Sequence, residues 1–125
     1  MIYRRVVVTG IGAITPVGLT AQETWQAILQ GKSGVGPIQG FDAQNLPVRI
    51  AAEVKATPLM PLVAAALAEA RSRDFDAREL RRFSRFMLFA LKAAAEAICD
   101  AGLNNPPPDS ERFSVSVGVG MGGLG

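Results

Sequence analysis

Glycines near the end of the chain are the residues whose spacing first suggests chemistry. In SVSVGVGMGGLG, a strand-like run meets a loop with Gly118, Gly120 and Gly123 at the G-x-G-x-x-G spacing of a dinucleotide-binding turn. That turn needs a following helix whose N–H groups meet a pyrophosphate, and we expect none after Gly125. The loop is otherwise a flexible turn at a strand end, or a backbone that moves beside an apolar ligand with Met121 as the adaptable side chain. Composition alone favours the turn.

A second glycine-rich segment, TGIGAITPVG, follows three consecutive valines. A short-chain dehydrogenase would need glycines at the positions that hold Ile14 and Pro16. We therefore predict no cofactor site here. Instead, Gly10, Gly12 and Gly18 predict a tight turn in which two backbones pass closely.

Basic side chains form a third candidate site, comprising Arg78, Arg81, Arg82 and Arg85. They fall in the first turns of a predicted helix, where cations oppose the helix dipole. One interpretation is a solvated helix face, and the other is a surface for an acidic partner. Both stay open on the residues alone.

Composition excludes several kinds of site. The 125 residues contain no histidine, which excludes a Ser–His or Cys–His pair and a His-ligated metal within this chain. The one cysteine, Cys99, lies near the negative end of a predicted helix and is interpreted as inert. A net charge of +2 does not argue for nucleic acid, and no apolar run is long enough for an export signal or a membrane span. We expect a cytoplasmic protein.

The elements that must position these residues alternate between strand and helix. Residues 4–9, 48–54 and 112–119 have the β-branched or alternating pattern of strands. A helix should follow Thr20 as N-cap, with Glu23 completing a capping box, and end at Gly31. A second helix is predicted from about Pro61 to about Ser72. Strands separated by helices predict a mainly parallel α/β sheet.

The clearest predicted helix spans residues 76–101, with Asp76 as its cap and Gly102 as its stop. At 100° per residue, one apolar stripe contains Phe83, Met87, Ala90, Ala94, Ala97 and Ala101. Leu91 and Ile98 widen it. The opposite, polar face contains Arg81, Arg85, Lys92 and Glu96. In the first predicted helix, which follows Thr20, the predicted buried stripe is Trp25, Ile28 and Leu29.

Five segments in order resemble the start of a β-ketoacyl-acyl carrier protein synthase, most similar to the synthase II branch. They are RRVVVTGIGAITPVG, TWQAILQGKSGVGPIQGFD, LPVRIAAEV, RRFSRFMLFALKAAAEAICDAGL and VGVGMGGLG. The resemblance covers almost the whole chain. It implies a thiolase-like αβαβα layered fold, of which residues 1–125 would be the start of the N-terminal half without an internal domain boundary.

The resemblance also implies the elongating reaction of fatty acid synthesis, without a cofactor or metal. An acyl group is carried on a cysteine, malonyl on the carrier protein loses CO₂, and the carbanion attacks the thioester. In the family, the nucleophilic cysteine follows the glycine loop, and two histidines and a lysine come later. Cys99 does not match that position. We therefore assign no catalytic residue within this chain and expect it to be inactive alone.

Two binding roles carry over by resemblance. Arg78, Arg81 and Arg82 match the family's basic patch for acyl carrier protein, in its acyl and malonyl forms. Gly120, Met121 and Gly122 match the gate of the acyl pocket. The resemblance further implies a homodimer in the complete enzyme, and neither nucleic acid nor membrane as a partner.

Two other classes of function stay open. One is a non-catalytic module that binds a carrier protein or another subunit. The other is a fragment of a nucleotide-binding oxidoreductase.

Overall fold

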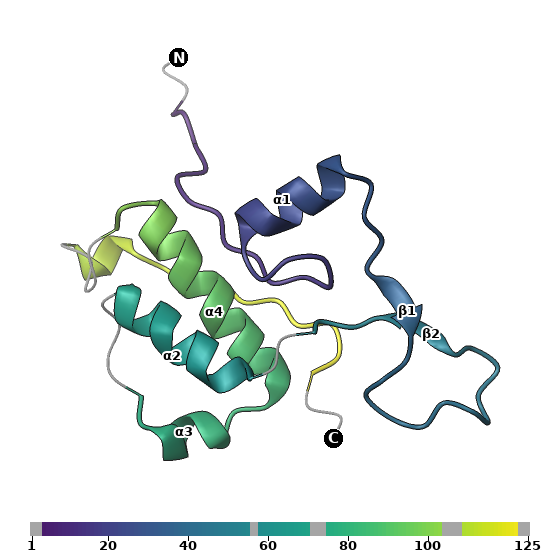
Figure 1. The fold of residues 1–125 in the computed structure, drawn as a ribbon. Coiled ribbons are helices and arrows are strands. Elements are labelled where there is room, and N and C mark those ends of the chain that lie inside the picture. Colours follow the sequence, from purple (N-terminus) through teal and green to yellow (C-terminus); the bar gives the residue numbers. More distant parts are fainter. Residues whose placement is uncertain (1–3, 56–57, 71–74, 104–108, 123–125) are drawn as a thin grey trace.

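The computed structural model describes residues 4–55, 58–70, 75–103 and 109–122 (Figure 1). Its elements are α1 (Ala21–Leu29), β1 (Val35–Pro37), β2 (Ile50–Ala52), α2 (Leu59–Glu69), α3 (Ala77–Arg81), α4 (Arg85–Asp100) and the 3-10 helix η1 (Ser110–Arg112). Helices α2, α3 and α4 pack together, and the β1–β2 pair projects beyond α1 at one end of the molecule.

The ends of α1 follow the local sequence signals. The Thr20 hydroxyl accepts a hydrogen bond from the N–H of Glu23 at 3.0 Å, as predicted for an N-cap. The Glu23 carboxylate accepts the N–H of Leu19 at 2.7 Å, one residue further back than a standard capping box. Beyond the C-terminus, Gly31 has a φ of +64°, which confirms its predicted stop position.

The hydrophobic core lies between α2 and α4, with α3 packed against α2. On α2, Val63, Leu67 and Ala70 lie on one face because they are four and three residues apart. The other buried members of this core are Leu80, Leu88 and Ala95. The predicted second helix is thus confirmed as α2, starting two residues earlier than expected.

The predicted helix over residues 76–101 is two helices. Asp76 caps α3 with a complete capping box to Glu79. After Arg81 the chain leaves the helix, and Ser84 is extended as the N-cap residue of α4. Phe83, at N′ of α4, packs against the core cluster, which includes Leu88 at N4; this is the spacing of a hydrophobic staple.

The predicted buried stripe of residues 76–101 is partly correct, and that of α1 is wrong. Of the first stripe, Phe83, Leu91 and Ile98 pack against the core cluster. Met87, Ala90 and Ala94 are exposed, and the buried residues of α4 are Leu88, Lys92 and Ala95. On α1, Trp25, Ile28 and Leu29 are each more than half exposed. The reason is that α2 covers a different side of α4, and no sheet layer within the described residues covers the predicted stripes.

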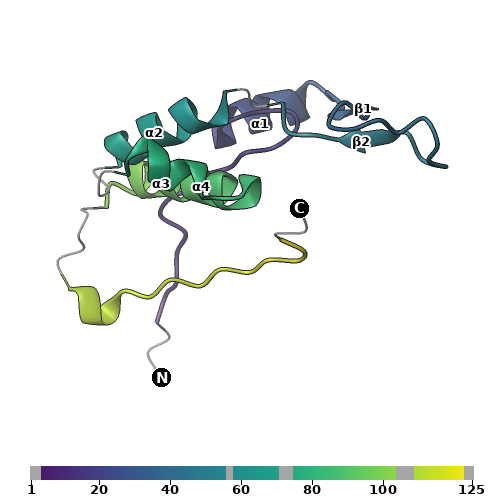
Figure 2. The same ribbon diagram turned by 90° about the horizontal axis from the view of Figure 1, so that it is seen from below.

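The strands also differ from the prediction. Residues 4–9 and 113–119 form no strand in the described chain, and η1 occupies the start of the second segment. β2 lies inside the predicted strand 48–54, but it pairs antiparallel with β1, for which no strand was predicted. Figure 2 shows the segment after η1 running on the opposite side of α4 from α2. The described residues therefore contain no parallel sheet.

The N-terminal glycine turn is confirmed as a close passage of backbones. A Cβ on Gly10 would lie 2.2 Å from the carbonyl oxygen of Ala97, and one on Gly12 would lie 1.9 Å from that of Ala93. A Cβ on Gly18 would meet the N of Thr24 at 2.4 Å. Only glycine lets this loop reach the α4 backbone.

None of the helices in the described part of the chain combines the length and the apolar composition needed to cross a membrane.

Candidate functional site

The three arginines predicted to bind a carrier protein lie on one short element. Arg78 and Arg81 belong to α3, and Arg82 is its C-cap residue. All three side chains are exposed, and their guanidinium groups make no hydrogen bond or ion pair within the described residues. They form an exposed positive surface of three charges within five residues, here called the arginine patch.

The break after α3 corrects the electrostatic argument made from the sequence. In one continuous helix these arginines would lie near the N-terminus and oppose the dipole. In the structure, Arg78 and Arg81 lie in the last turn of a five-residue helix, where cations are favourable. The dipole therefore gives no reason to invoke an acidic partner, and the exposure of the patch remains as the structural observation.

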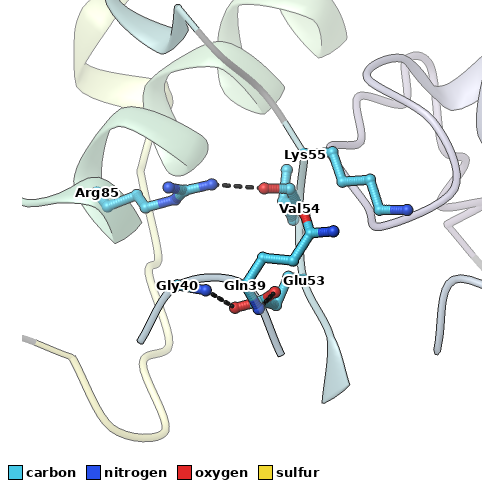
Figure 3. A pocket seen from close by; sticks show the side chains of 6 residues that line it. All are labelled: Gln39, Gly40, Glu53, Val54, Lys55 and Arg85. Atoms are coloured by element: carbon cyan, nitrogen blue, oxygen red, sulfur yellow. Dashed lines mark hydrogen bonds between the residues drawn. The ribbon is translucent and has the colours of Figure 1, made fainter. Parts of the chain in front are cut away.

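Arg85 differs from the patch. It is the first residue of α4, and its Nη2 donates a hydrogen bond to the carbonyl oxygen of Val54, just after β2 (Figure 3). Its guanidinium carbon also lies 5.3 Å from the centre of the Phe89 ring. Arg85 thus ties the start of α4 to the β1–β2 pair, a role the sequence analysis missed because nothing local marks Val54 as its partner.

An open hollow of about 570 Å³ lies between these elements, lined by Gln39, Gly40, Glu53, Val54, Lys55 and Arg85 (Figure 3). The Glu53 carboxylate accepts the N–H groups of Gln39 at 2.8 Å and Gly40 at 3.0 Å. Glu53 and Arg85 therefore both bind backbone groups of the protein. These bonds hold the β1–β2 pair against the start of α4. The hollow coincides with neither predicted site.

The predicted acyl gate lies at the other end of the described chain. Met121 is 86% exposed, and a Cβ on Gly118 or Gly120 would meet nothing within 4 Å. Gly122 is different, because a Cβ there would lie 2.9 Å from Cζ of Phe86. Residues 118–122, here called the gate loop, thus lie against Phe86, the second residue of α4.

The structure does not test the interpretation of this loop as a dinucleotide-binding turn, because Gly123, its third glycine, lies outside the described residues.

A partly buried charge pair holds the N-terminal loop on α4. Lys92 Nζ donates to Glu96 Oε2 at 3.0 Å, and Lys92 is only 7% exposed. The Glu96 carboxylate also accepts the N–H groups of Ala21 at 2.7 Å and Ala13 at 3.2 Å. Burial would raise the pKa of Glu96, but these bonds from Ala21, Lys92 and Ala13 together lower it. Both residues were predicted on the polar face opposite the apolar stripe, and their burial shows that this face is not the solvent-facing one here.

The Lys92–Glu96 pair has a structural role. The Glu96 oxygens already bind two backbone N–H groups and an ammonium, so the carboxylate is not poised to take a substrate proton. One turn further on, Asp100 Oδ2 accepts the N–H of Ile11 at 2.9 Å. Two acidic side chains of α4 thus satisfy backbone donors of the glycine turn and of α1.

Cys99 is exposed near the C-terminal end of α4. Desolvation by its surroundings, together with the charge of Glu69, raises the pKa of its thiol. A raised pKa disfavours the thiolate, in agreement with the interpretation of Cys99 as inert.

Comparisons with known proteins give a consistent match. Residues 3–125 match the family described as "Beta-ketoacyl synthase, N-terminal domain". The chain is 39% identical over 127 residues to a 3-oxoacyl-(acyl-carrier-protein) synthase 2 of Synechocystis sp., and 38% identical over 127 residues to that of Coxiella burnetii. It is 35% identical over 130 residues to the protein of the same name from Vibrio harveyi.

These matches cover nearly all of this chain but little of the relatives. They include 97% of the chain for the first two proteins and 99% for the third. The chain spans only about a quarter of their length, 26% for the first two and 27% for the third.

Proposed function

The chain belongs to the beta-ketoacyl synthase family and matches its N-terminal domain. We therefore propose that it forms part of a condensing enzyme that elongates acyl chains carried on acyl carrier protein. The observation that carries the proposal is the family match over residues 3–125, with relatives named 3-oxoacyl-(acyl-carrier-protein) synthase 2. In the complete protein, this segment would belong to a thiolase-like layered fold whose sheets are completed by other strands.

The proposed reaction is a decarboxylating condensation. An acyl group on an enzyme cysteine is attacked by the carbanion left when malonyl on a carrier protein loses CO₂. The new carbon–carbon bond gives a 3-oxoacyl carrier protein, and the cysteine thiolate is released. We assign none of these chemical steps to residues 1–125, whose proposed part is to bind the carrier and to border the acyl pocket.

The exposed arginine patch supports the carrier-binding part of the proposal. Three guanidinium groups without partners in the described residues suit the carboxylates of an acidic protein. Contacts of this kind chiefly steer and orient the partner, so they should weaken as salt concentration rises. Arg85 is excluded from the patch because its guanidinium already binds Val54.

The reaction is tested with the complete protein. Incubation with acyl and malonyl carrier protein should release CO₂ and form a 3-oxoacyl carrier protein, whereas the 125-residue chain alone should form none. Absence of product from the complete protein would refute the proposed activity, and turnover by the chain alone would refute our assignment of the chemistry elsewhere. Titration with NAD(P) tests the oxidoreductase alternative, for which we expect no binding.

The arginine patch is tested by charge reversal in the complete protein. Replacing Arg78, Arg81 and Arg82 by Glu should weaken carrier affinity about tenfold or more, since three exposed pairs are worth roughly 0.5 kcal/mol each. The matched control reverses Arg4, Arg5 and Arg112, which are also exposed, and produces the same change in net charge. Equal loss in both variants would point to net charge alone and would contradict a specific patch.

A cytoplasmic location and a homodimeric complete enzyme are the remaining parts of the proposal. Both come from the family resemblance. Sedimentation of the complete protein would test the dimer.

A further inference from the structure

The three described glycines of the gate loop have unequal surroundings. Gly118 and Gly120 have open space where a Cβ would be, with nothing within 4 Å. At Gly122 a Cβ would lie 2.9 Å from Phe86 Cζ, 3.0 Å from Phe86 Cε2 and 2.8 Å from Cγ1 of Val119. A Cβ at 122 would therefore force the Val119 side chain or the tip of the Phe86 ring to shift, whereas a Cβ at 118 or 120 would displace nothing.

Backbone conformation does not explain this difference. Among the described glycines, only Gly31 and Gly102 have positive φ. Alanine at 120 or 122 would therefore meet no backbone strain of its own. Two side chains crowd position 122: Val119 belongs to the loop itself, and the Phe86 ring is the part of α4 that the loop meets there.

The ring belongs to a firmly held part of the molecule. Phe86 is half-buried in the first turn of α4, directly after Arg85, which is bonded to Val54. Leu88, two residues further, is a core residue only 6% exposed. A rigid aromatic ring on a fixed helix start can stop the movement of a glycine-rich loop that is unobstructed at its other glycines.

We propose that Phe86 is a specificity-determining positioning residue. Its ring blocks movement of the gate loop toward α4 at Gly122 and so determines the position of Met121. This inference rests on the proposed function, because it takes Gly120, Met121 and Gly122 as the border of the acyl pocket. Phe86 itself acts through the loop. It determines the preferred acyl length by fixing how far the loop can withdraw toward α4.

Replacing either partner has an opposite geometric effect. Phe86→Leu removes the outer ring atoms and lets the loop approach α4. Gly122→Ala adds a Cβ against the ring and forces the loop away. The two substitutions should therefore shift the ratio of kcat/KM for long over short acyl substrates in opposite directions, each on the order of tenfold, the effect of about one methylene of pocket space.

The experiment is a double-mutant cycle in the complete enzyme, with Gly118→Ala as the matched control, because a Cβ at Gly118 meets nothing within 4 Å and Gly118 lies outside the proposed pocket border. In the Phe86→Leu background, Gly122→Ala should regain most of the wild-type chain-length ratio, because the Cβ no longer meets the ring and the other close atom, Val119 Cγ1, belongs to the loop itself. Gly118→Ala should leave the ratio unchanged in either background. Independent effects of Phe86→Leu and Gly122→Ala, or equal effects of the two alanine substitutions, would overturn the proposal.

Thermal unfolding of the same variants separates this inference from the proposed function. Gly122→Ala should lower the Tm, and Phe86→Leu should reduce that loss, whether or not the protein condenses acyl groups. A complete protein with the expected coupling in Tm but no product at any acyl length would refute the activity. Product formation with no coupling in either measurement would refute the role of Phe86.

Discussion

Single glycines decide how closely the N-terminal loop approaches α4. Gly10 and Gly12 leave no space for a Cβ, because the carbonyl oxygens of Ala97 and Ala93 lie 2.2 Å and 1.9 Å from where it would be. Gly10→Ala or Gly12→Ala in the complete protein should cost about 1–3 kcal/mol of unfolding free energy, as overpacking does. Gly36→Ala is the control, since a Cβ there meets nothing within 4 Å. Chemical denaturation measures the loss, and equal stability of the Gly12 and Gly36 variants would contradict the close packing.

A single carboxylate adds a pH dependence to the same contact. Glu96 has a lowered pKa in the folded protein, so the unfolded chain takes up its proton first as pH falls. Its stabilising contribution is therefore complete at neutral pH. It is lost as pH falls below the ordinary value of 4.5 and through the lower folded-state pKa.

Glu96→Gln tests this dependence. The amide keeps the shape but loses the charge that binds Lys92 and two N–H groups, so the variant should lose about 2 kcal/mol at pH 7. The difference from wild type should shrink when unfolding is repeated below pH 4.5. Glu111→Gln, at an exposed position, is the control. A wild-type advantage that grew with acidity would reverse the sign and exclude the mechanism.

At the scale of elements, the two helix starts after residue 75 are built differently. The Asp76 carboxylate accepts the N–H groups of Arg78 and Glu79, both at 2.7 Å. Ser84, by contrast, caps α4 without a side-chain hydrogen bond, and its buried Oγ has no partner in the described structure. Asp76→Ala should therefore cost about 1 kcal/mol, and Ser84→Ala should be neutral or slightly stabilising. Denaturation midpoints test the pair, and a larger loss at Ser84 would show that its hydroxyl is bonded after all.

Local signals explain which elements could be predicted from the sequence. Thr20, Gly31, Asp76 and Gly102 mark helix ends through their own backbone or side chain, and each lies where predicted. The helix break at Ser84 was not predicted, because the apolar and basic residues on both sides of it fit a single helical repeat. Its only local signals were the Ser itself and the Phe83–Leu88 spacing of a staple.

Features that need a distant partner could not be predicted. Which side of α4 is buried depends on where α2 packs, and the strand pattern of residues 4–9 forms no ladder without a neighbouring strand. The same limit applies to the site. Composition favoured a simple turn for the gate loop, and neither the Phe86–Gly122 contact nor the Arg85–Val54 bond has a sequence signal, since each joins residues more than 30 apart.

At the scale of the whole molecule, apolar side chains remain uncovered on several elements. Val6 is 94% exposed and Val115 78% exposed, and exposed apolar residues also include Val8, Trp25, Met87 and Val117. These lie on extended segments and on helix faces that the described residues do not cover. Exposed apolar surface of this kind favours association, and unpaired extended segments add free N–H and C=O groups.

The 125-residue chain expressed by itself should therefore self-associate. Light scattering should give a mass that rises with concentration from the 13.2 kDa of the single chain, with binding of an apolar dye. Replacing Val115 and Val117 by Thr keeps β-branched shape while adding polar groups, and should reduce both signals. As a control, Val35→Thr changes an exposed valine of β1, which already has a paired strand, and should have a smaller effect. A monomer that unfolds cooperatively would instead mean that the core between α2 and α4 is sufficient to hold the chain together.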